Sequence, residues 1–302
     1  MASFASRVTQ SLPASLAILS LPRCANPACL RPPTLWQRWW ARHEGLHFEQ
    51  NWYCSAECFA VGLVTRVEAL AWPPAGVRRL QPRFPLGLIL LEQGVIAEEQ
   101  LQKALACQRG AASGRIGEWL IRLGAATALD ITNALAVQQN CPVFSRTSSE
   151  SFPGAMQFPA PLIRRYGGVP VYFSSAANTL YLGFAGPLNR SLLRAAAHLV
   201  RCRLEPCIVS GELCGSAVAR WETEGRGESI SIEQRQSAAE MARAIAGYAE
   251  QARASSCAIA RCEDYLWTRL YGDLRSLDLL FRVAPESGTL PDPHRLCGLR
   301  FN

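Results

Sequence analysis

The chain has 302 residues, of which 49% are hydrophobic and 18% are charged. These values are typical of a globular protein and exclude a wholly disordered chain, and the length allows two or three domains of about 100–150 residues. The formal net charge is +7, and every basic residue except Lys103 is arginine, but these arginines form no dense run. The charge therefore favours anionic partners in general and does not by itself indicate nucleic acid.

The N-terminal residues 1–21 predict a flexible leader. The apolar run from Leu12 to Leu21 is interrupted by Pro13 and lacks a small-residue cleavage site, so it is not a convincing signal peptide. No stretch of the sequence approaches the roughly 20 apolar residues that a membrane-spanning helix needs. We therefore expect no transmembrane segment and a cytoplasmic location.

Four of the twelve cysteines have the spacing of metal ligands. Cys24 and Cys29 form one pair, and Cys54 and Cys58 form a second pair, with 24 residues between the two pairs. Zn²⁺ takes four soft ligands in a tetrahedron, and two short-looped cysteine pairs supply them with little strain. The sequence predicts a zinc-binding module over residues 22–75 with a structural role, because four thiolates leave no open position for catalysis. The alternative is four unrelated cysteines.

Residues 85–139 contain an internal repeat with an offset of 30 residues. Each unit predicts a short helix, a glycine stop and a second helix, with Gly94 and Gly124 at the left-handed position that ends the first helix. Thr127 is expected to cap the next helix with Asp130 as its partner, whereas Ala97 cannot make the equivalent bond. The matching positions are Gly87 with Gly117, Leu90 with Leu120, Leu101 with Ile131, Ala104 with Ala134, Leu105 with Leu135 and Gln108 with Gln138.

The two units resemble the tandem motifs of the MshEN, or GspE N-terminal, domain, which begins type II secretion and type IV pilus assembly ATPases. The resemblance continues through Pro161-Leu162-Ile163-Arg164-Arg165-Tyr166 and the closing Leu204-Glu205-Pro206-Cys207-Ile208-Val209, and covers residues 84–222. It implies a helical subdomain over 85–139 and an α/β subdomain over 141–222. The phosphate loop of those ATPases has no counterpart in this sequence. We therefore expect no ATP hydrolysis and no enzyme activity.

In some members of that family the paired motifs bind cyclic di-GMP, one motif for each half of the ligand. Arginine can stack on guanine or bond its O6 and N7 edge, and glycine lets the backbone approach closely. Pro85 stands where the first motif has arginine, and Arg83 is the candidate substitute. The alternative is that these are fold residues around a pocket that binds nothing. The resemblance implies ligand contacts from Gly87, Leu90, Leu101, Leu105 and Gln108 in the first unit and from Arg115, Gly117, Leu120, Ile131, Leu135 and Gln138 in the second.

Residues 229–285 predict a separate C-terminal α+β module, followed by a tail over 286–302. An Ala-rich helix is expected over Glu233–Ala254. Strands are expected near Cys257–Arg261, Tyr265–Tyr271 and Leu277–Val283. We interpret Asp264, Asp273 and Asp278 as solvated surface, because each adjoins an expected turn or strand end.

The sequence as a whole predicts a multi-domain α+β protein: a small zinc-finger-like module, a tandem-repeat helical subdomain with an α/β subdomain, and a C-terminal α+β module. The expected function is that of a non-catalytic regulatory or adaptor protein of a secretion or pilus apparatus, with cyclic di-GMP as candidate ligand and a protein of that machinery as partner. Two alternatives stay open. One is a protein–protein scaffold with a silent pocket, and the other is nucleic-acid binding by the zinc module through Arg23, Arg31, Arg38 and Arg42.

Overall fold

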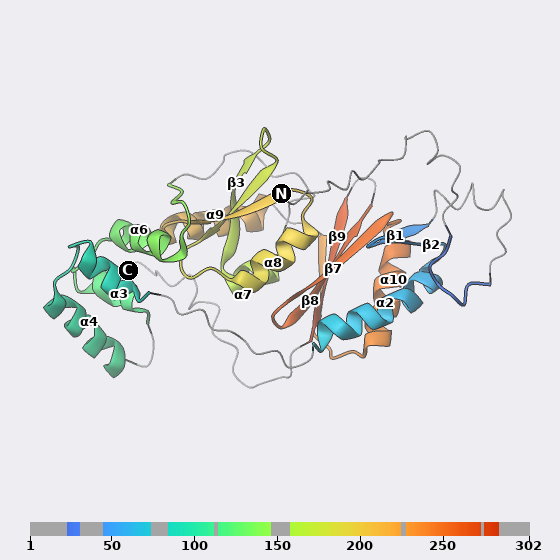
Figure 1. Cartoon of the computed structure of the whole chain (residues 1–302), viewed down its shortest axis with the longest axis horizontal. Helices are drawn as coiled ribbons and strands as arrows, with labels where there is room; N and C mark the ends of the chain where they lie inside the picture. Colours follow the sequence, from blue (N-terminus) through green and yellow to red (C-terminus); the bar gives the residue numbers. More distant parts are fainter. Residues whose placement is uncertain are drawn as a thin grey trace, which may run out of the picture.

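The computed structural model describes residues 23–30, 45–73, 84–111, 114–145, 158–224, 228–272 and 275–283. The expected leader and tail, Arg83, and the arginines at 31, 38 and 42 lie outside these residues. Figure 1 shows an elongated arrangement, with the helical repeats at one end, a small sheet in the middle and a larger sheet with its helices at the other end. Within the described residues, no helix combines the length and apolarity required to cross a membrane.

The repeat units fold as two interlocked helical pairs. Gly94 and Gly124 have φ angles of 68° and 66°, so the left-handed helix ends predicted from sequence are confirmed. The Thr127–Asp130 cap is also confirmed, with Asp130 N donating to Thr127 Oγ1 at 3.2 Å. The first helix of each unit packs on the second helix of the other, α3 on α6 and α5 on α4. The four helices are α3 (Leu86–Glu92), α4 (Glu98–Gly110), α5 (Ile116–Arg122) and α6 (Ala128–Gln139).

A three-stranded sheet follows the repeats in the order β3-β4-β5. β3 is antiparallel to β4, and β4 is parallel to β5, so the carboxyl ends of β4 and β5 lie side by side. The elements of this part are α7 (Ala160–Tyr166), β3 (Gly168–Ser174), β4 (Thr179–Phe184), α8 (Arg190–Leu199), β5 (Arg203–Ile208) and α9 (Gly211–Glu224).

A six-stranded sheet, in the order β2-β1-β7-β8-β9-β6, combines segments from both ends of the described chain. β1 pairs in parallel with β7, with His47 opposite Ser256 and Phe48 opposite Cys257. Its strands are β1 (Leu46–Phe48), β2 (Asn51–Tyr53), β6 (Glu228–Ile232), β7 (Ser256–Cys262), β8 (Tyr265–Tyr271) and β9 (Ser276–Arg282). β6 begins at Glu228, directly before the start of the C-terminal module predicted over 229–285.

Helix α2 (Ala56–Ala71) packs along α10 (Ala238–Gln251), and both helices share one hydrophobic core with the sheet. The segments predicted as separate modules over 22–75 and 229–285 are therefore two halves of one structural unit. We call this unit the split domain. The repeat-containing region, residues 84–224, is inserted between its halves.

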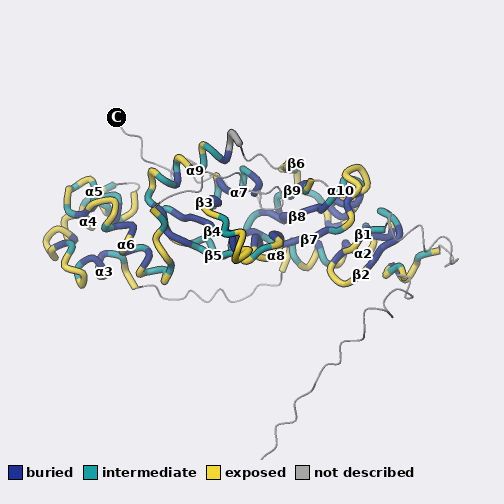
Figure 2. Tube along the Cα trace, turned by 90° about the horizontal axis from the view of Figure 1, so that it is seen from above, coloured by how far each residue is buried: buried dark blue, intermediate teal, exposed yellow. Residues whose placement is uncertain are grey.

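The two faces of the large sheet bury different neighbours. Ile259, Leu266 and Phe281 belong to the core beneath α2 and α10. Ala260, Trp267 and Leu280 belong to a second core, which contains the three-stranded sheet and α8. Figure 2 shows the buried strands of both sheets between partly exposed helices. Helix α8 contacts both β5 and β7, so it joins the inserted region to the split domain.

The prediction that Asp278 is solvated is wrong. Its side chain is 2% exposed, and Arg269, directly opposite on the neighbouring strand, is fully buried. Arg269 Nε and Nη2 donate to the two carboxylate oxygens at 2.8 and 2.7 Å, and Trp267 Nε1 donates to Oδ1 at 2.7 Å. Asp264 pairs with Arg165, and Asp273 lies outside the described residues.

Candidate functional site

A pocket of about 290 Å³ lies between the second repeat unit and the carboxyl ends of β4 and β5. Its helical wall comes mainly from α5 and α6, with Leu86 at the start of α3, and its opposite wall comes from the loops after the two strands. The edge where parallel strands end is a common place for ligands in α/β folds. The second wall consists of Ala185, Gly186, Pro187, Val209 and Gly211.

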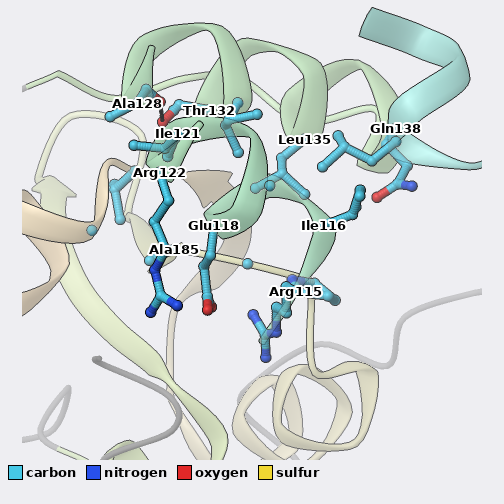
Figure 3. A pocket seen from close by; sticks show the side chains of 17 residues that line it. Arg115, Ile116, Glu118, Ile121, Arg122, Ala128, Thr132, Leu135, Gln138 and Ala185 are labelled. Atoms are coloured by element: carbon cyan, nitrogen blue, oxygen red, sulfur yellow. Dashed lines mark hydrogen bonds between the residues drawn. The ribbon is translucent and has the colours of Figure 1, made fainter. Parts of the chain in front are cut away.

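Three charged side chains of the second unit line the pocket. Arg115 lies just before α5, and Glu118 and Arg122 follow on the same helix. Figure 3 shows all three projecting in the same direction from the helix. Arg122 also lies over the Trp119 ring, 5.0 Å from its centroid. The pocket therefore presents two cations and one carboxylate, and the first residue of α9, Gly211, adds the positive end of a helix.

The Arg115 guanidinium lies against the backbone of Gly186. A methyl group at Gly186 would lie 2.3 Å from Arg115 Nη1, closer than atoms can approach. A larger residue at 186 would displace the end of the Arg115 side chain, so glycine leaves room for this contact between the helical part and the α/β part.

The pocket gathers some of the predicted ligand residues and not others. From the second unit, Arg115, Gly117, Ile131, Leu135 and Gln138 line it, and Leu120 is fully buried in the helical core instead. None of the predicted first-unit residues lines it. Of those, Leu90 and Leu101 are buried in the same helical core, and Leu105 is 38% exposed.

The two motif glutamines make equivalent backbone bonds between the units. Gln108 Nε2 donates to the carbonyl of Gly114 at 3.0 Å, just before the second unit. Gln138 Nε2 donates to the carbonyl of Phe84 at 2.7 Å, just before the first unit. Gly114 and Phe84 are also 30 residues apart. The glutamine of each unit therefore bonds the residue just before the other unit. These glutamines hold the units together, which is the fold role that the alternative interpretation gives them.

The four cysteines predicted as metal ligands come together. Their sulfur atoms all lie within 4.8 Å of one another. Cys29 Sγ lies 3.6 Å from Cys54 Sγ, which lies 3.8 Å from Cys58 Sγ. A tetrahedron with metal–sulfur bonds of about 2.3 Å has edges of about 3.8 Å, whereas a disulfide bond is only about 2 Å long. The arrangement has the size of a four-thiolate metal site.

Two of these thiols differ in acidity because their surroundings differ. Burial raises the pKa of Cys54 to about 12, and its hydrogen bonds with Cys29 and Cys24 add to the rise. Burial also acts to raise the pKa of Cys58, but hydrogen bonds from Asn26 and Ser55 outweigh it and lower that pKa to about 7. A divalent cation would stabilise the thiolate form of all four.

Several pocket residues escaped the motif comparison. Glu118 and Arg122 lie three and seven positions after Arg115, a helical spacing that places them on one face with it. From that spacing, Glu118 and Arg122 could have been predicted to lie beside Arg115. The residues from 185–187, Val209 and Gly211 carry no such signal, because only the strand order brings them to the helices.

Several solved structures match a little under half of this chain. The structure of MshE with cyclic di-GMP is 26% identical, covers 46% of this chain and 99% of its own, and has a TM-score of 0.38. The N-terminal domain of XpsE is 17% identical, covers 45% of this chain and 92% of its own, and has a TM-score of 0.33. A second crystal form of the XpsE domain is 20% identical. The match covers 47% of this chain and 99% of that domain, with a TM-score of 0.27. No family model and no curated protein matches the chain.

We expect the motif glycines to be required for packing whether or not the pocket is occupied. A methyl group at Gly87 would lie 2.6 Å from Leu101 Cδ1, and one at Gly117 would lie 2.9 Å from Ile131 Cγ2. Replacing either by alanine should lower the free energy of unfolding by about 1–3 kcal/mol. Gly215→Ala in α9 is the matched control, because nothing lies within 4 Å of the added atom. It should raise stability by up to about 1 kcal/mol. Urea denaturation measures all three, and a stable Gly117→Ala would contradict the packing role.

Proposed function

We propose that this protein is a non-catalytic regulatory or adaptor protein of a secretion or pilus apparatus and that its second repeat unit binds cyclic di-GMP. The observation that carries the proposal is the position of Arg115. This motif arginine lines a pocket together with Ile131 and Leu135, two apolar residues of the same motif. The resemblance of the tandem units to cyclic di-GMP-binding motifs supports the same ligand.

The charged groups of the pocket suit a guanine nucleotide. Arg115 can stack on the base or bond its O6 and N7 atoms. Glu118 can accept hydrogen bonds from the N1–H and the amino group of guanine, which adenine does not offer in that arrangement. Ile131 and Leu135 provide an apolar surface for the ring, and the N-terminus of α9 favours a phosphate. Because Gln138 already bonds the Phe84 carbonyl, we give it no direct role toward the ligand.

The pocket volume of about 290 Å³ lies at the lower end of the range for small-molecule sites, roughly 300–1,000 Å³. It therefore suits one nucleotide half of the ligand. The second half would extend toward the first unit, where Pro85 offers no charged group in place of the motif arginine. We accordingly expect weaker binding than a site with two arginines would give.

Titration calorimetry of the full chain with cyclic di-GMP tests this assignment. We expect binding in the submicromolar to micromolar range, and Arg115→Ala should weaken it by at least about tenfold, or about 1.4 kcal/mol. Arg109→Ala is the matched control, because Arg109 lies on α4 outside the pocket, where its Nε donates to the Leu105 carbonyl. Cyclic di-AMP should bind more weakly than cyclic di-GMP, and Glu118→Gln should reduce that preference.

Absence of heat at tens of micromolar cyclic di-GMP, with a folded protein confirmed by circular dichroism, would contradict nucleotide binding. The domain would then be a protein–protein scaffold with a silent pocket. Equal loss of binding in Arg109→Ala and Arg115→Ala would also count against the pocket, since it would indicate general charge attraction.

We also propose that the cysteine cluster binds one structural Zn²⁺. The support is the tetrahedral size of the sulfur arrangement and the presence of four soft ligands, which leaves no position open for substrate. Cys24 and Cys29 belong to the short segment 23–30, whereas Cys54 and Cys58 flank the start of α2. The metal would therefore attach that segment to the rest of the split domain.

Metal analysis of the purified protein should find about one zinc per chain. Cys54→Ser should abolish this zinc, whereas Cys207→Ser, at a buried cysteine of the inserted region, should retain it. Inductively coupled plasma mass spectrometry after gel filtration gives the stoichiometry. Less than one tenth of an equivalent in protein prepared without chelator would contradict the assignment.

A further inference from the structure

Asn26 lies inside the loop between the first two cysteines and uses both ends of its side-chain amide. Nδ2 donates to Cys58 Sγ at 3.3 Å, and Oδ1 accepts a hydrogen bond from Ala28 N at 3.0 Å. Its backbone carbonyl accepts from Cys29 N at 3.1 Å. The residue is only 9% exposed, which makes it one of the few buried polar side chains among the described residues.

The backbone bond and the Oδ1 bond organise the loop between Cys24 and Cys29. The turn over Asn26–Cys29 directs Cys29 toward the other sulfurs. This loop has four intervening residues, two more than the commoner zinc-binding pair. The longer loop is therefore closed by a specific polar side chain.

The Nδ2 hydrogen bond stabilises the negative charge that the cluster would carry with a metal bound. Four thiolates around one divalent cation carry a net charge of −2, and Cys54 and Cys58 are buried. Such a charge is stable in a protein only when hydrogen-bond donors or positive dipoles surround it. The Asn26 amide is a donor aimed at Cys58 Sγ. Cys58 also lies in the first turn of α2, at the positive end of the helix.

We propose that Asn26 is a fifth functional residue of the metal centre, a positioning residue that holds Cys58 and stabilises its metal-bound thiolate through an N–H···S hydrogen bond. This inference rests on the zinc site proposed above. It assigns to the loop residue a role toward the metal, in addition to its role in the turn.

Asn26→Asp separates the two roles, because aspartate keeps the Oδ1 acceptor for Ala28 N and loses the donor toward Cys58. Asn26→Leu removes both without adding charge. We expect zinc affinity, measured by competition with a chromogenic chelator on the full chain, to fall by about 10–100-fold in both variants. Asn133→Asp, the same change at an exposed position on α6, should leave the affinity unchanged.

Cobalt substitution provides a readout that a purely structural role would not change. Loss of the hydrogen bond raises the energy of the sulfur electrons, so the thiolate-to-Co²⁺ charge-transfer band of Asn26→Asp and Asn26→Leu should move to longer wavelength at full occupancy. Wild-type affinity together with an unshifted band in both variants would overturn the role of Asn26 while leaving the zinc site intact. Absence of zinc and of the cobalt band from the wild-type protein would instead overturn the zinc site itself.

Discussion

The parallel pairing of β1 with β7 brings segments from both sides of the inserted region into one sheet. It joins a strand that precedes the inserted region to one that follows it, and the packing of α2 on α10 repeats that connection on the helical layer. Closing so long a loop costs little more entropy than closing a moderate one, because the cost grows only with the logarithm of loop length. The buried apolar contacts of the shared core offset this entropy cost. They include Phe59, Leu63 and Ile245.

This connection also determines where the two proposed sites lie. The inserted region packs on the free face of the large sheet through α8, and its helical repeats extend away at the far end of the molecule (Figure 1). The cysteine cluster lies at the opposite end, beside β2 and the start of α2. The proposed ligand pocket and the proposed metal site therefore use separate parts of the fold. Loss of metal should act first on the split domain and leave the pocket geometry to the packing of the inserted region.

Local signals in the sequence were sufficient for the helices of the repeat and for the clustering of the four cysteines. The repeat spacing located the helices and the left-handed glycines, and the two cysteine pairs lie together as their spacing predicted. Non-local pairing was not predictable in this way. The sequence of the short, half-exposed strand β6 does not differ from that of a linker. Arg269 lies opposite Asp278 only because of the register between β8 and β9. For the same reason the loop at 185–187 could not be linked to Arg115 from the sequence.

We expect the two flanking segments to unfold as one cooperative unit around the inserted region. Native-state hydrogen exchange in increasing urea, read by mass spectrometry on peptic fragments, tests it most directly. Peptides from α2 and β1 should exchange with the same opening free energy and the same urea dependence as peptides from α10 and β7–β9. If α2 instead opened at a markedly lower urea concentration, with α10 and the large sheet still protected, the two segments would be separate modules and the claim would be wrong.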